Sequence, residues 1–510
     1  MAGLVRAHPT SIGVGAAVVG FLALCVLRIA SLKPWVTADE YQHVDYALAV
    51  WRGVAPGYLP DTTQPEMPEQ GKFIQHVANH PPLYPYLIGW ILRLGVATGH
   101  SWVSVYLARG VTALIAAAAI CLIAATAYRL AGRRSAPAIG AALIAANCSP
   151  LVSVATTVMN DALFIALSCA VIYLMVVLLA DGYRLRTSVL LVLAATADLL
   201  TRSNAIVVIV ASVVALLALA AAPRFLRGGN DQPVRRAPIV LTAGAVTLVP
   251  ILASGWFYLR NLERWGNLFG DHIPGIPYGP EHDSMVGLSL QPGFWFYLWN
   301  QFYGRPIAGG VGAMEFGSGW PARPEPIYVW ALIGTLIAAL VAVVGMLRWL
   351  ITRPPAADPV LRGPLLVVAW AVPALVLAGT VAGTASHFAI GGSPHARYFL
   401  PGLAFIAAAL AMAAQRWGRL RGVAMAALTI AGMAGIWTFW HSLLARPRVG
   451  LGQESLPSDV PTAMAANGFP FAEFVALIGA SAIVVSFAIA IAIYVRVEPQ
   501  SSKVERSHQS

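Results

Sequence analysis

The chain has 510 residues, of which 58% are apolar and only 11% are charged, with a mean hydropathy of +0.70. This composition excludes an ordinary soluble protein, and repeated apolar runs of about 15 to 28 residues predict a polytopic helical membrane protein. The net charge is +11. Because the basic residues gather in short connections between apolar runs, we interpret this charge as a signal for membrane orientation and expect no nucleic-acid partner.

Apolar segments along the chain predict an all-α polytopic bundle of about 12 transmembrane helices. These segments are 12–32, 103–129, 136–158, 161–181, 187–200, 203–222, 238–258, 326–347, 364–385, 398–415, 422–443 and 471–494. Segments 187–200 and 203–222 are short for the roughly 20 residues that a perpendicular span needs, so we expect a hairpin broken at residues 201–204. The run 82–97 is also short. We expect a re-entrant or juxtamembrane helix there.

The distribution of basic residues predicts how these helices are oriented. With the N-terminus inside, the cytoplasmic pieces hold 19 of the 33 basic residues but only 5 of the 22 acidic ones. Every short connection obeys the positive-inside rule only if segment 82–97 does not cross the membrane. Both termini are then cytoplasmic, and the first span is an uncleaved signal anchor, since Arg28 and Lys33 follow it without a small-residue cleavage site. The predicted extracytoplasmic pieces are 33–102, 259–325, 385–397 and 444–470.

The first of these outer loops contains a predicted amphipathic helix. Thr37 and Glu40 have the S/T-x-x-E spacing of a capping box, so the helix should begin at about Ala38. One face carries an apolar stripe suited to lying on a bilayer surface. The stripe consists of Tyr41, Val44, Leu48 and Trp51. The opposite face carries three polar side chains, which are Asp39, His43 and Tyr46.

Asp39 is the first candidate for a catalytic base. It lies in the first helical turn, where the helix dipole favours an anion, so a solvated acid is the simpler alternative. Glu40 is explained by the capping box but stays a candidate beside it. His43, one turn further on, either orients the Asp39 carboxylate or is an exposed histidine. His80 precedes Pro81 and Pro82 at a predicted helix start, and it is a candidate for the same pocket.

Polar residues at the outer ends of later spans extend the candidate set. Asn160 and Asp161 form a tight outer turn, where they either cap the next helix or add a second carboxylate to the pocket. Arg202 lies at the tip of the broken hairpin, where an unpaired cation is costly. It either pairs with Asp198, one turn back, or receives an anionic group such as a lipid phosphate.

Two further cations lie where a span meets the outer surface. Arg260 and Asn261 close a span with the features of an interfacial aromatic belt and a snorkelling arginine. His395 and Arg397 directly precede another span, and Arg397 is placed to hold a phosphate. We therefore include all four residues as candidates for a phosphate site or for its pocket.

Several of these motifs occur in a characteristic order. They are Asp39-Glu40, His80-Pro81-Pro82-Leu83, Asn160-Asp161, Leu200-Thr201-Arg202, Trp256-x-x-x-Arg260-Asn261 and Ala396-Arg397-Tyr398-x-Leu400-Pro401. Together they resemble the bacterial branch of the GT-C glycosyltransferase superfamily over about residues 12–415. Its relatives include protein O-mannosyltransferases, lipid A aminoarabinose transferases and uncharacterised predicted membrane proteins, and the chain is most similar to the last group.

The resemblance implies a multi-pass enzyme of the bacterial inner membrane whose active site is extracytoplasmic. Its donor would be a polyprenyl-phosphate-linked sugar within the membrane lipid, and its acceptor a cell-envelope glycan, lipid or protein. Asp39 would be the base, while Arg202, Arg260 and Arg397 would hold the donor phosphate. Arg202 occupies a position that is usually Lys in relatives. Some relatives need a divalent metal and others do not, and the scattered acids here leave that cofactor open.

The expected organisation is a catalytic module over 1–415, C-terminal helices over 416–494 and a cytoplasmic tail over 495–510. Two other classes of function stay open at this point. A transporter or lipid-glycan flippase would suit about twelve spans, although such proteins usually keep ionisable groups near the bilayer midplane and show repeated halves. A non-catalytic membrane assembly protein is the third alternative, because one acid does not make an enzyme.

Overall fold

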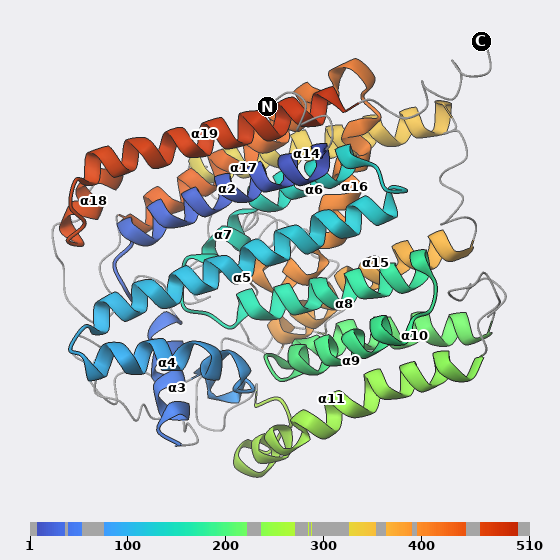
Figure 1. Cartoon of the computed structure of the whole chain (residues 1–510), viewed down its shortest axis with the longest axis horizontal. Helices are drawn as coiled ribbons and strands as arrows, with labels where there is room; N and C mark the ends of the chain where they lie inside the picture. Colours follow the sequence, from blue (N-terminus) through green and yellow to red (C-terminus); the bar gives the residue numbers. More distant parts are fainter. Residues whose placement is uncertain are drawn as a thin grey trace.

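The computed structural model describes residues 8–35, 39–53, 76–221, 236–270, 284, 287, 326–352, 364–389, 395–444 and 459–497. These residues form a bundle of long helices, which confirms the all-α fold class (Figure 1). The first half contains α2 (Pro9–Ser31), α3 (Glu40–Trp51), η1 (His76–Asn79), α4 (Leu83–Ala97), α5 (Ser101–Leu130), α6 (Ser135–Ala146), α7 (Ser149–Ala155), α8 (Asp161–Asp181), α9 (Leu185–Leu199), η2 (Ser203–Ala205), α10 (Ile206–Ala221) and α11 (Arg236–Trp265). The second half contains α14 (Pro326–Thr352), α15 (Pro364–Ala389), η5 (Ala396–Gly402), α16 (Leu403–Gln415), η6 (Gly418–Leu420), α17 (Arg421–Leu444), α18 (Val460–Ala466) and α19 (Ala472–Arg496).

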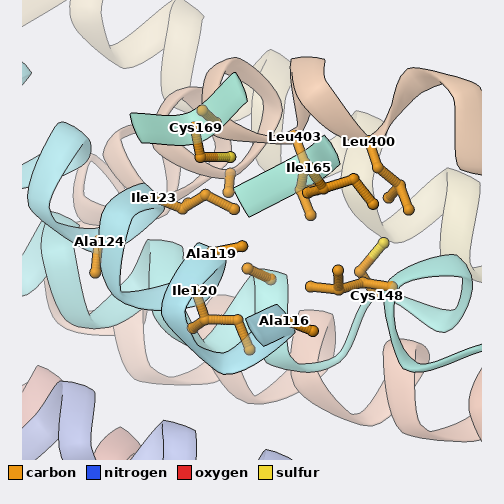
Figure 2. Close-up of a cluster of buried hydrophobic side chains, with 14 of the residues drawn as sticks. Ala116, Ala119, Ile120, Ile123, Ala124, Cys148, Ile165, Cys169, Leu400 and Leu403 are labelled. Carbon is orange, nitrogen blue, oxygen red and sulfur yellow. The ribbon is translucent and has the colours of Figure 1, made fainter. Parts of the chain in front are cut away.

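Nine helices in the described part of the chain are long and apolar enough to cross a membrane, or ten if α6 and α7 count as one broken span. Their centre is rich in alanine. Almost all of α6 is buried, and α5 packs against both α6 and α8. Figure 2 shows Ala119 and Ile123 of α5 on the side that faces Cys169 and Ile165 of α8. Small side chains let helix backbones approach closely, which is how helices associate in a membrane.

The predicted span 136–158 is wrong as a single helix. It is broken between α6 and α7, and the two pieces are bent by 65°. Pro150 lies in the first turn of α7, where it cannot donate a backbone hydrogen bond to the preceding turn. Asn147 ends α6 and donates its side-chain amide to the carbonyl of Leu143 instead. The expected break at 201–204 is confirmed, because α9 ends at Leu199 and the chain restarts as η2 and α10.

Helices α3 and α4 lie together at one end of the bundle, opposite the end where α2 begins and α19 finishes (Figure 1). The prediction that the apolar stripe of α3 lies on the bilayer is wrong. Tyr41, Val44 and Leu48 are buried against Tyr84 and Ile88 of α4. The polar face of α3 is buried as well, so this helix is enclosed by protein on both faces. Helix α4, with 15 residues, is a short apolar helix as expected for 82–97.

Candidate active site

Four charged side chains from distant parts of the chain meet beside the N-terminus of α3. Asp39 is the N-cap of α3, and Asp161 is the first residue of α8. Arg202 precedes η2 in the break between α9 and α10, and Arg397 belongs to η5. We call these four residues the charge cluster. All four are candidate site residues on the sequence alone, and the fold brings them together.

Ion pairs join the charge cluster into one chain. Nη2 of Arg397 donates to Oδ2 of Asp39 at 2.6 Å. Nε of the same arginine lies 3.9 Å from Oδ2 of Asp161. Nη1 of Arg202 donates to the other oxygen of Asp161. The Asp161 carboxylate therefore bridges the two arginines, and the alternative in which Arg202 pairs with the Asp198 side chain is not the one that the structure shows. Asp198 accepts a hydrogen bond from Ser168 at 2.8 Å.

The two halves of the charge cluster differ in their access to solvent. Asp161 and Arg202 are 2% and 7% exposed, whereas Asp39 and Arg397 are 29% and 19% exposed. The ring of Tyr398 lies against both guanidinium groups, with its centroid 5.0 Å from the central carbon of Arg202 and 5.5 Å from that of Arg397. The inner pair is thus enclosed by protein, whereas the outer pair is partly exposed.

Three histidines surround the charge cluster, and burial keeps them neutral. Burial lowers the pKa of His43 to about 4, although the neighbouring carboxylates of Asp39 and Asp161 oppose this shift. Burial and the charge of Arg397 lower the pKa of His395 to about 3, and burial holds the pKa of His80 well below its ordinary value. These side chains can therefore donate or accept hydrogen bonds at neutral pH without adding charge.

The Asp39 carboxyl is ionised for a different reason. Burial by itself raises its pKa, but the charge and hydrogen bond of Arg397 outweigh this effect. The pKa of Asp39 is therefore below the ordinary value for an aspartate. In this structure Asp39 is an anion that is already partnered, which makes it a weak proton acceptor.

Glu40 is not part of the charge cluster, and its carboxylate has a structural role. It is fully buried and receives Nε and Nη2 of Arg109 at 2.7 and 2.6 Å. It also accepts the backbone N–H groups of Trp35 at 3.1 Å and Val158 at 3.0 Å. The position of Glu40 is therefore explained by a buried ion pair with Arg109 of α5. Thr37, the other residue of the predicted capping box, lies outside the described residues. Helix α3 begins at Glu40, not at about residue 38.

Arg109 was missed as a candidate from the sequence. Besides Glu40, its guanidinium binds the carbonyls of Leu32 at 2.6 Å and Lys33 at 3.1 Å. It thereby ties the end of α2 and the start of α3 to α5. The available signal was an arginine within the apolar run 103–129, because an ionisable residue inside a span usually has a specific partner.

Arg260 and Asn261 lie at one end of α11 and hold it against η1. Nη1 of Arg260 donates to the carbonyl of Ala78 at 3.3 Å, and its guanidinium stacks on the rings of Phe257 and Trp265. The Asn261 amide donates to the carbonyl of Asn79 at 3.1 Å. These contacts position the segment that leads to His80. The structure thus places Arg260 on η1, whereas Arg202 and Arg397 bind the carboxylates of the charge cluster.

Two buried polar atoms near the charge cluster have no hydrogen-bond partner among the described residues. They are Nδ1 of His43 and Oδ1 of Asn160. Asn160 donates its amide to the carbonyl of Thr201 at 3.2 Å, which joins the start of α8 to the α9–α10 break. No three His, Cys, Asp or Glu side chains in the described part of the chain are grouped as a metal site requires. The metal requirement therefore stays open.

The sequence matches one family of known proteins over part of its length. Residues 79–252 match the family model described as dolichyl-phosphate-mannose-protein mannosyltransferase. No curated protein matches the sequence at a significant level. Over this segment the chain is similar to that family of membrane glycosyltransferases. Asp161 and Arg202 lie inside the matched segment, while Asp39 and Arg397 come from the parts before and after it.

Solved structures show weaker likeness. ArnT from Cupriavidus metallidurans, bound to undecaprenyl phosphate, is 15% identical with a TM-score of 0.48, and the match covers 94% of this chain and 74% of that one. Its apo structure is 13% identical with a TM-score of 0.47, covering 95% and 78%. The oligosaccharyltransferase AglB from Archaeoglobus fulgidus, with an inhibitory peptide and a dolichol-phosphate, is 12% identical with a TM-score of 0.46, covering 96% and 56%. At these values the similarities do not decide function.

The charge cluster combines two chemical capacities. A carboxylate can accept a proton from an attacking hydroxyl or amide, and guanidinium groups can stabilise a departing phosphate. Arginine suits the second role because its planar fork matches phosphate oxygens in pairs. In this structure the carboxylates and guanidinium groups pair with one another, so the two positive and two negative charges of the cluster cancel.

Proposed function

We propose that the chain transfers a sugar from a polyprenyl-phosphate donor to an extracytoplasmic acceptor in the bacterial inner membrane. The observation that carries this proposal is the ion pair between Asp39 and Arg397, 3.9 Å from the Asp161–Arg202 pair. The match of residues 79–252 to a mannosyltransferase family supports a phosphate-linked lipid donor and favours a transferase over a transporter. The catalytic module is proposed to cover residues 1–415, with both termini cytoplasmic.

Asp39 is the proposed base, and Arg202 and Arg397 are the proposed phosphate ligands. The acceptor's nucleophilic atom attacks the anomeric carbon of the sugar while its proton passes to Asp39. The bond between that carbon and the phosphate oxygen breaks, and its electron pair leaves with the phosphate. The departing group gains negative charge, which the two guanidinium groups stabilise. His43, His80, Asn160 and His395 line the pocket as neutral hydrogen-bonding groups.

Arg260 and Asn261 are proposed to act less directly. Their contacts with η1 fix the segment that carries His80, whose carbonyl accepts a hydrogen bond from Tyr46 of α3 at 2.5 Å. Glu40 is likewise proposed to position Asp39 rather than to take part in the reaction, since Arg109 and two backbone N–H groups occupy its carboxylate. A substrate sugar then contacts the groups of the charge cluster and the histidines around it.

A deletion strain tests the reaction. Profiling of its lipids and envelope glycans should show loss of one sugar and accumulation of a polyprenyl-phosphate-linked sugar. Expression of the natural sequence should restore the profile, whereas Asp39→Asn, expressed at an equal level in the membrane, should not. Asp181→Asn is the matched control, because Asp181 also pairs with arginines, Arg129 and Arg133, but at the opposite end of α8. Restoration by Asp39→Asn would remove the proposed base.

A further inference from the structure

The proposed base and one proposed phosphate ligand are bound to each other in this structure. We propose that the phosphate of the lipid-linked donor displaces Asp39 from Arg397, so that the base is released only when the donor is in place. This inference rests on the proposed function and adds to it an order of events. Donor binding comes first, and it converts the Asp39–Arg397 pair into a free carboxylate and an arginine–phosphate contact.

Charge balance requires such an exchange. The charge cluster contains two carboxylates and two guanidinium groups, so the site is neutral before a ligand enters. A sugar-linked phosphate brings one negative charge, and no cation of the cluster is without a carboxylate neighbour. In a partly buried site, opposite charges a few ångströms apart attract more strongly than in water. The phosphate can therefore gain a full ionic contact only by taking an arginine from one of the two acids.

Arg397 is the arginine better placed to change partner. Its side chain is 19% exposed, whereas that of Arg202 is 7% exposed and stacks on the rings of Tyr398 and Phe164. Nε of Arg397 has no hydrogen-bond partner among the described residues. Its Nη1 lies 3.7 Å from the sulfur of Met159, a weak acceptor. Apart from Asp39, its described contacts are therefore weak, so Asp39 is the partner that a phosphate would have to displace.

Release of Asp39 also changes its chemistry in the direction that the reaction needs. The charge and hydrogen bond of Arg397 hold the pKa of the Asp39 carboxyl low against the opposing effect of burial. When that arginine turns to the phosphate, the effect of burial remains and the pKa rises. The carboxylate then accepts the acceptor's proton more readily. After the transfer Asp39 is neutral and the phosphate carries a second negative charge, so the total charge is conserved and both arginines are retained by the product.

Binding of a long-chain polyprenyl phosphate without sugar, measured in nanodiscs of zwitterionic lipid by native mass spectrometry, tests this exchange. Asp39→Asn removes the competitor of the phosphate for Arg397, so it should bind the probe about tenfold more tightly while losing transfer. The same substitution in an Arg397→Gln background should have no effect on binding. Asp181→Asn is the control and should bind as the unmodified protein does.

The outcomes separate this inference from the proposed function. If the unmodified protein binds the probe and Asp39→Asn binds it equally or more weakly, the exchange is wrong while the donor class stands. If the unmodified protein does not bind the probe at all, the proposed function fails, and the exchange fails with it. Asp39 makes no side-chain capping hydrogen bond, so Asn is expected to be tolerated. If it is not, Asp39→Ser also removes the charge and is measured in the same way.

Discussion

Replacement of Glu40 by Gln should destabilise the protein strongly, because it leaves Arg109 charged in a site that is closed to water. The side chains of Arg109 and Glu40 are 1% and 0% exposed. Removing one partner of a fully buried ion pair typically costs about 3–5 kcal/mol. Glu40→Ala should cost more, because the N–H groups of Trp35 and Val158 also lose their acceptor, at about 1–3 kcal/mol each.

The experiment is equilibrium unfolding of the purified protein in mixed detergent micelles, followed by tryptophan fluorescence. Asp181→Asn provides the comparison, since the Arg129–Asp181 pair is 20% and 15% exposed and should therefore lose less stability than the closed Glu40–Arg109 pair. A double replacement of Glu40 and Arg109 by Leu should not restore stability. The carbonyls of Leu32 and Lys33 would then have lost the donor that Arg109 provides.

Two results would refute this reasoning. A loss of less than about 1 kcal/mol for Glu40→Gln would show that the pair does not hold α3 in place. Full stability together with complete loss of transfer would return Glu40 to a role in the chemistry. The expected pattern is a loss of stability with reduced transfer that recovers at lower temperature, because a positioning residue acts through the geometry of Asp39 and not through a bond to the substrate.

Arg202→Ala should weaken donor binding and raise the donor KM, and an unchanged KM would count against a phosphate role. Between pH 7 and pH 5 the contribution of His43 to the free energy of unfolding should fall by roughly 2 kcal/mol. The pKa of His43 is about 4 in the folded state, below the ordinary 6.5, so only the unfolded chain takes up the proton in this range. The variant His43→Gln should therefore show a weaker dependence of the free energy of unfolding on pH. A reporter fused after Ala97 should lie outside the cell, and a cytoplasmic signal would overturn the predicted non-crossing segment 82–97.

Most helix positions and the residue types of the charge cluster could be predicted from the sequence, although the single span expected over 136–158 is broken in the structure. Apolar runs mark the helices because lipid and protein interior both exclude polar side chains, and the break at 201–204 was visible as a polar interruption. Periodicity could not distinguish a helix face on lipid from one packed on protein, so the surroundings of α3 were predicted wrongly. The bend before Pro150 was missed although Asn147 and Ser149 interrupt the segment, because the run as a whole is apolar enough to read as one span.

Only the tertiary structure decided which charges meet. Asp39 and Arg397 are 358 positions apart, and no local pattern relates them. The local expectation that Arg202 pairs with Asp198 failed because the fold brings Asp161 to it and leaves Asp198 bonded to Ser168. From the sequence, Glu40 is assigned to a capping box with Thr37, but in the fold its partner is Arg109, 69 positions away. An ion pair forms wherever the packed helices bring opposite charges into contact, and that geometry is a property of the whole fold.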